Sequence, residues 1–93
     1  MDNKITSKKL EKYFKLTSSA LDVAKGSVIK GKEKYSKEIL EMVENYLSDA
    51  KFFREKGDFI NAFAALNYSH GWIDAGVRLD IFNVLDNKLF TIK

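Results

Sequence analysis

The chain has 93 residues, with no cysteine, no proline, one histidine, and 16 basic against 13 acidic side chains. A chain of this length builds one hydrophobic core, so we expect a single domain over residues 1–93. The lack of cysteine excludes disulfides, thiolate catalysis and cysteine-ligated metal sites, and one histidine excludes a site that needs two imidazoles. We therefore expect no metal and no cofactor.

Membrane and export signals are missing from the sequence. No apolar run approaches the ~20 residues that span a bilayer. The first residues, Met1 to Ile5, lack the apolar stretch of a signal peptide. We expect a cytoplasmic protein with no membrane partner.

Positive charge gathers in the first third of the chain. Residues 1–37 hold ten lysines against four carboxylates, a net +6, whereas residues 38–93 carry a net −3. The lysines of interest are Lys8, Lys9, Lys12, Lys15, Lys30, Lys32 and Lys34. They fit either electrostatic attraction to nucleic acid or an ordinary solvated helix face, and both interpretations stay open.

Three segments carry apolar residues at steps of three and four, which predicts helices over about 7–29, 36–56 and 59–79. Thr6 or Ser7, Ser36 and Asp58 are suitable N-caps. The short turn around Gly57 makes the second and third helices antiparallel neighbours. The expected fold is all-α, a three-helix up-and-down bundle with a short extended or hairpin tail over residues 80–93.

The third predicted helix differs from the other two, because residues 59–73 contain no Asp, Glu, Lys or Arg. One of its faces combines small residues with a tryptophan: Ala62, Ala65, Ser69, Trp72, Ile73 and Gly76. A helix that is apolar around so much of its circumference is usually central or covered on a second side.

Large apolar residues also mark the tail: Ile81, Phe82, Val84, Leu85, Leu89, Phe90 and Ile92. Residues 86–88 between them are turn-forming. Because an exposed strip of this kind would be sticky, we expect the tail to pack on the bundle or on a partner.

Four polar residues follow one stripe of the third helix: Asn67, His70, Asp74 and Arg78. They fit structural hydrogen bonds and an Asp74–Arg78 ion pair, or a groove that orients a ligand or partner. A third interpretation makes His70 a base oriented by Asp74. No recognised motif supplies a nucleophile, so we expect no enzyme.

From about Leu10 to Phe82 the chain resembles a known family, and three places carry the resemblance: Asp49-Ala50-Lys51-Phe52-Phe53, Gly57-Asp58-Phe59, and the stretch from Asn61 that ends in His70-Gly71-Trp72-Ile73-Asp74-Ala75-Gly76. These residues are similar to the archaeal domain of unknown function family three hundred and fifty-seven. The resemblance implies a three-helix bundle and an archaeal, cytoplasmic source. It implies no activity and assigns no site residues.

The leading hypothesis is a non-enzymatic module for protein interaction or self-association, which uses the third helix and the tail. The alternative is an accessory protein bound to RNA or a ribonucleoprotein through the Lys-rich first helix. A small-molecule binder or enzyme built on the polar stripe is the third hypothesis.

Overall fold

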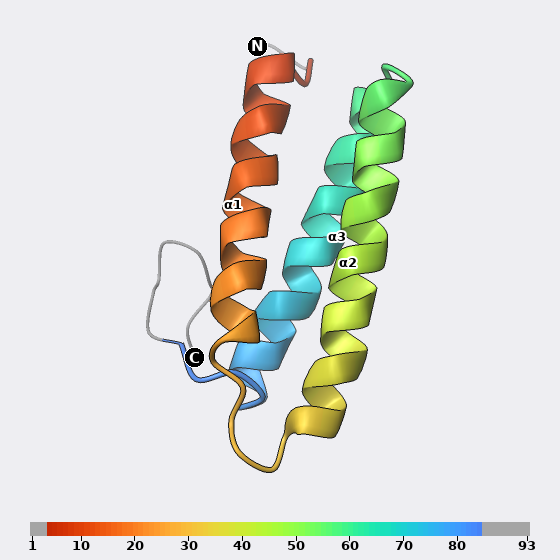
Figure 1. Cartoon of the computed structure of the whole chain (residues 1–93). Helices are drawn as coiled ribbons and strands as arrows, with labels where there is room; N and C mark the ends of the chain where they lie inside the picture. The colour runs from red at the N-terminus through yellow and green to blue at the C-terminus, as the bar shows by residue number, and fades with distance from the viewer. Residues whose placement is uncertain (1–3, 85–93) are drawn as a thin grey trace.

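A computed structural model describes residues 4–84 as three helices of alternating direction, which run down, up and down in the view of Figure 1. The helices are α1 (Ser7–Lys25), α2 (Glu33–Glu55) and α3 (Phe59–Arg78). No strand occurs within residues 4–84. The predicted all-α, three-helix up-and-down bundle is confirmed.

Two of the predicted caps hold their helices as expected. The Thr6 hydroxyl accepts a hydrogen bond from the backbone N–H of Lys9 at 3.1 Å. The Asp58 carboxylate accepts one from the N–H of Asn61, also at 3.1 Å. Gly57 adopts a φ of 77°, the left-handed conformation that glycine reaches without steric cost. Gly57 and Asp58 together define the tight reversal between α2 and α3.

The first helix ends at Lys25, four residues before the predicted end. The following backbone pairs with the segment after α3 instead of continuing the helix. Val28 forms an isolated antiparallel bridge with Phe82, and the N–H of Ile29 donates to the carbonyl of Ile81 at 2.9 Å. A tertiary pairing therefore replaces the last helical turn that the apolar pattern predicts.

The second helix begins at Glu33, so the prediction that Ser36 is its N-cap was wrong. Both carboxylate oxygens of Glu33 accept the N–H of Gly31, each at 3.0 Å. Ser36 lies buried inside the first turn, where its hydroxyl donates to the carbonyl of Glu33 at 2.9 Å. A carboxylate at the positive end of the helix starts α2 earlier than a serine cap would. The C-terminal ends of α2 and α3 agree with the prediction within one residue.

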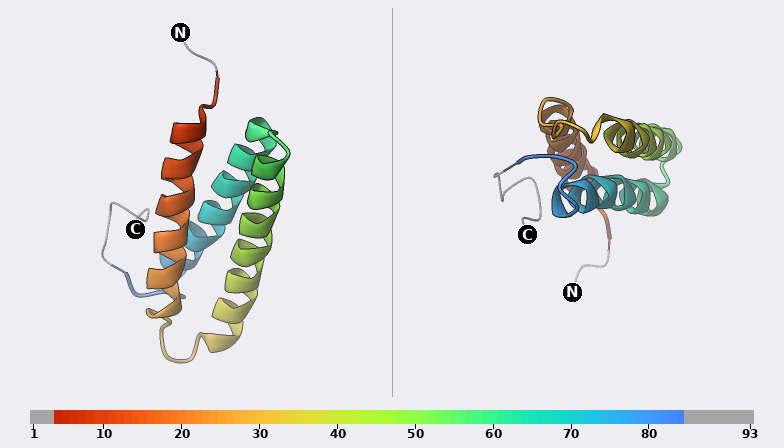
Figure 2. Two further views of the ribbon diagram at one scale, coloured as in Figure 1. Left: turned by 45° about the horizontal axis from the view of Figure 1, so that its top comes forward. Right: turned by 90° about the horizontal axis from the view of Figure 1, so that it is seen from below.

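The third helix is central, as its composition predicts. It packs along α2 on one side and against α1 on another, whereas α1 and α2 contact each other little (Figure 2). Its buried side is formed by Ala62, Ala65, Leu66, Ser69, Ile73, Gly76 and Val77. The hydroxyl of Ser69 donates to the carbonyl of Val43 on α2 at 2.9 Å, which satisfies a fully buried polar group.

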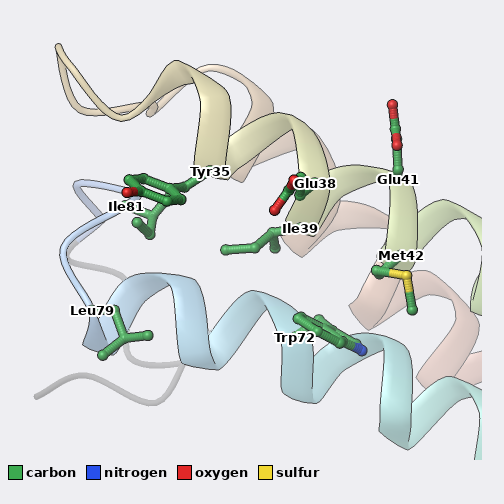
Figure 3. A pocket seen from close by; sticks show the side chains of 8 residues that line it. All are labelled: Tyr35, Glu38, Ile39, Glu41, Met42, Trp72, Leu79 and Ile81. Atoms are coloured by element: carbon green, nitrogen blue, oxygen red, sulfur yellow. The ribbon is translucent and has the colours of Figure 1, made fainter.

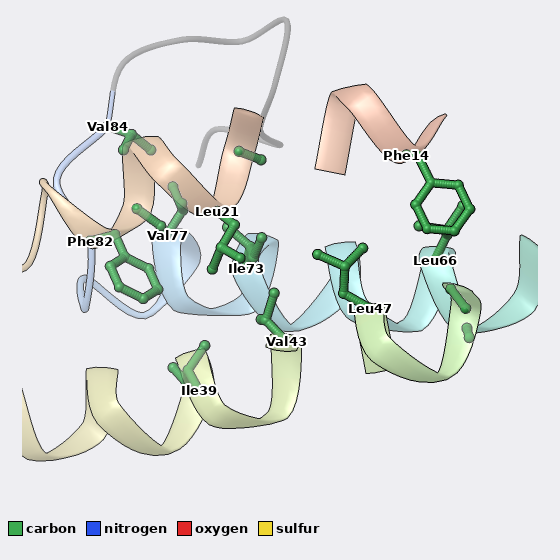
Figure 4. Close-up of a cluster of buried hydrophobic side chains, with 14 of the residues drawn as sticks. Phe14, Leu21, Ile39, Val43, Leu47, Leu66, Ile73, Val77, Phe82 and Val84 are labelled. Atoms are coloured by element: carbon green, nitrogen blue, oxygen red, sulfur yellow. The ribbon is translucent and has the colours of Figure 1, made fainter. Parts of the chain in front are cut away.

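The chain after α3 folds back over the end of the bundle (Figure 4). Asp80 turns it with a φ of 60°, and Ile81, Phe82 and Val84 are buried. A Cβ added to Gly76 would overlap the Phe82 ring, at 2.6 Å from its Cδ2 atom. The missing side chain of Gly76 is therefore what admits Phe82. The predicted packing of the tail on the bundle is seen for residues 80–84, and the rest of the tail lies outside the described residues.

Two glycine substitutions in α3 should have opposite effects on stability. Gly76→Ala should destabilise the fold, because overpacking against Phe82 costs about 1–3 kcal/mol and exceeds the gain of about 1 kcal/mol in helix propensity. Gly71→Ala should stabilise by up to about 1 kcal/mol, since a Cβ added there would meet nothing within 4 Å. Urea denaturation followed by circular dichroism measures both, and equal effects would contradict the proposed role of Gly76.

The contact between Glu33 and Gly31 should appear as a pH-dependent stability. Hydrogen bonding to the backbone N–H of Gly31 lowers the pKa of Glu33 below its ordinary value. A carboxyl whose pKa is lower in the folded state stabilises the fold above its unfolded pKa, and this contribution is lost as pH falls through the folded pKa.

Glu33→Gln should therefore lower the urea midpoint at about pH 7 and have almost no effect at about pH 3. Glu55→Gln, at the other end of the same helix, is the control. If the urea midpoint of Glu33→Gln is lower than that of the wild type by the same amount at the acidic pH, the charge of Glu33 is not the cause of the effect.

Candidate functional site

Three of the four predicted polar residues meet beside a small cavity between α1 and α3. His70 and Asp74 are half-buried, with 3.9 Å between His70 Nε2 and Asp74 Oδ1. Asn67 joins them in lining a cavity of about 220 Å³. Arg78 is exposed, and within residues 4–84 no ion pair at 4 Å or less joins it to Asp74. The predicted Asp74–Arg78 pair is therefore not formed.

His70 has a partner on α1 that was not predicted from the sequence. Thr17 is 2% exposed, and its Oγ1 lies 3.2 Å from His70 Nδ1. The two atoms are within hydrogen-bond distance, and the tautomer of the imidazole decides which of them donates. Thr17 is too buried to attack a substrate, so this contact links α1 to α3. In the sequence, this contact is indicated only by the hydroxyl of Thr17, which occupies a position of the apolar stripe of α1.

The predicted basic region divides into two separate patches. Lys8, Lys12 and Lys15 are exposed along one strip of α1 and line a shallow depression. The other lysines fall around the connection to α2, beyond the far end of α1: Lys30, Lys32 and Lys34. Some of the charge also serves packing, since the Lys9 ammonium lies 5.7 Å from the centre of the Phe63 ring.

An apolar depression lies between α2 and α3, where no site was predicted. Tyr35, Ile39 and Met42 of α2 face Trp72 and Leu79 across a cavity of about 450 Å³ (Figure 3). Tyr35 is 55% exposed and Leu79 68% exposed. We call this feature the α2–α3 groove and define it by Tyr35, Glu38, Ile39, Glu41, Met42, Tyr68, Gly71, Trp72, Ala75, Leu79 and Ile81.

The groove continues past the indole of Trp72. A second depression, lined by Tyr68, Gly71 and Ala75 with Asn67, shares Trp72 with the first one. Trp72 was predicted on the same face as the buried small residues of α3, yet it is only half-buried. It stands at the edge of that face, where α2 no longer covers it.

The described residues give no sign of a metal site or a membrane span. Within residues 4–84 there is no group of three or more His, Cys, Asp or Glu side chains that could hold a metal ion. In that same range, no helix is long and apolar enough to cross a bilayer.

The fold and the groove define a three-helix bundle whose central helix is left partly uncovered. Residues 12–82 match the model of the family described as "Protein of unknown function (DUF357)", and the chain belongs to this family. No curated protein and no solved structure is matched by the chain. The match covers α2, α3 and most of α1, so it includes the groove as well as Thr17, His70 and Asp74.

Removing the α1 partner of His70 should weaken the bundle. Thr17→Val keeps the shape of the side chain but deletes the hydroxyl, so we expect a loss of about 1 kcal/mol in the free energy of unfolding. Ser19→Ala, on the exposed side of α1, is the control and should stay within about 0.5 kcal/mol of the wild type. Chemical denaturation measures both, and a Thr17→Val protein as stable as the wild type would show that the contact contributes nothing.

Proposed function

We propose that the protein is a non-enzymatic interaction module that binds another protein through the α2–α3 groove. The observation that carries the proposal is the exposure of Leu79 and Tyr35 beside the half-buried Trp72. Large apolar and aromatic side chains around a depression are typical of the buried centre of protein interfaces. Trp and Tyr are also among the residues that contribute most to binding energy there.

Catalysis has weaker support than binding. The Nδ1 atom of His70 lies within hydrogen-bond distance of the buried Thr17 hydroxyl, and its Nε2 atom is turned to Asp74. An imidazole held in this way between two helices acts as a structural link. A small-molecule site on the polar stripe would have to use the 220 Å³ cavity beside it, which is below the usual size of ligand pockets.

A second candidate function rests on the strip of lysines on α1. Lys8, Lys12 and Lys15 are exposed on one side of the helix, and such a strip favours contact with phosphates. Under this alternative the protein is an accessory of RNA or a ribonucleoprotein. An archaeal source and a cytoplasmic location remain predictions under both functions.

The groove is tested by adding a charge to it. In the native host, a tagged Leu79→Glu protein should lose the protein partner that the wild type retains, because a buried carboxylate opposes an apolar contact. Ile60→Glu is the matched control, since Ile60 is 74% exposed at the start of α3 and lies outside the groove. Partners are identified by mass spectrometry. The proposal is contradicted if a partner stays bound to the Leu79→Glu protein but is lost from the Ile60→Glu protein.

The RNA alternative makes a different prediction for the same purification. Reversing Lys8, Lys12 and Lys15 to Glu should abolish retention of RNA, and binding of the wild type should weaken steeply with salt. Treatment with ribonuclease should then release the associated proteins. Retention that depends neither on salt nor on these lysines would eliminate this function.

A further inference from the structure

The charges beside the α2–α3 groove point to the chemistry of its occupant. We propose that the groove binds a protein segment whose apolar side chains are flanked by lysine or arginine. This inference rests on the proposed function, since it assumes that the groove is the binding surface. It adds which kind of sequence the groove selects.

The α2 edge of the groove carries two carboxylates. Glu38 and Glu41 line the cavity and are exposed (Figure 3). Within residues 4–84, neither forms an ion pair at 4 Å or less, although Lys34 and Lys37 precede them by four residues. Two carboxylates beside an apolar depression therefore remain available to cations of an incoming chain.

The α3 edge carries no charge. Tyr68, Gly71, Trp72, Ala75 and Leu79 form it. The small Gly71 and Ala75 leave room for a backbone to approach, and nothing lies within 4 Å of the position where a Cβ of Gly71 would stand. An occupant with apolar side chains toward α3 and cations toward α2 matches both edges at once.

The remaining charges of the protein make this preference specific to the groove. The chain has a net charge of +3, so a basic segment gains no attraction from the protein as a whole. A second copy that paired groove to groove would bring further carboxylates and no cation, because Glu38 and Glu41 are the charged residues that line the groove. The charges thus favour a different, basic partner over self-association through this surface.

The chain contains one tryptophan, and it lies in the groove, so its fluorescence reports occupancy directly. The probes are two synthetic 14-residue peptides without tryptophan. The first has leucines at helical spacing and lysine at all of the remaining positions. The second has glutamate in place of each lysine. The lysine peptide should shift the Trp72 emission to shorter wavelength with a saturable dependence on concentration, and the glutamate peptide should bind at least about 10-fold more weakly.

The carboxylates are tested by the Glu38→Gln/Glu41→Gln double variant. Both side chains are exposed, so the fold should persist, and the affinity for the lysine peptide should fall about 3- to 10-fold. The control is Asp22→Asn/Glu55→Gln, which changes the net charge equally at exposed positions outside the groove. Its affinity should equal that of the wild type.

The outcomes separate the basic preference from the proposed function. Equal binding of both peptides, or an unchanged affinity of Glu38→Gln/Glu41→Gln, overturns the basic preference. The proposed function as an interaction module is then still supported if Leu79→Glu abolishes the binding of the peptides. If neither peptide changes the Trp72 emission at concentrations up to about 1 mM, a range that still detects weak association, the inference is overturned, and the Leu79→Glu purification decides the proposed function separately.

Discussion

The architecture depends on the need to cover a central helix that carries no charge through most of its length. Residues 59–73 of α3 lack Asp, Glu, Lys and Arg. Removing most of the surface of this helix from water therefore stabilises the folded state. Two helices can cover only part of it. α2 takes one side and α1 another, and they contact each other little. The face that remains includes Gly71 and Ala75 and is bordered by Trp72, and this face becomes one edge of the groove.

The same constraint explains the short segment after α3. Phe82 enters the space left by Gly76, and the backbone around it pairs with the connection between α1 and α2. This packing also places Ile81 in the lining of the groove together with Leu79. One local arrangement thus closes the core at one end of the bundle and shapes the surface that we propose for binding.

The fold could be predicted from the sequence because its local signals agree. Thr6, Gly57 and Asp58 punctuate the helices, and their side chains or backbone angles do what these residue types favour. The helix ends that were wrong, near Val28 and Ser36, depend on a long-range bridge and on a carboxylate that faces back to Gly31. Periodicity carries no information about either contact.

The candidate site was harder to predict for the same reason. The polar stripe was visible, but its partner Thr17 lies 53 residues away from His70 and looks like a core position in the sequence. The groove needed the pairing of α2 with α3 before Tyr35, Met42 and Leu79 could be seen together. Sequence patterns predict which side of each helix is buried. A groove depends on how far two packed helices cover each other, and the patterns do not contain that information.

The central claim is that the uncovered face of α3 is an interface with another protein. Photo-crosslinking tests it most directly, with a photoreactive phenylalanine analogue placed at Ala75 in the groove or at Asp22 on α1, expressed in the native host. We expect a discrete crosslinked protein from position 75 and none from position 22, because both positions are exposed but only the first lies in the groove. The absence of any crosslink from position 75, or the same product from both positions, would contradict the claim.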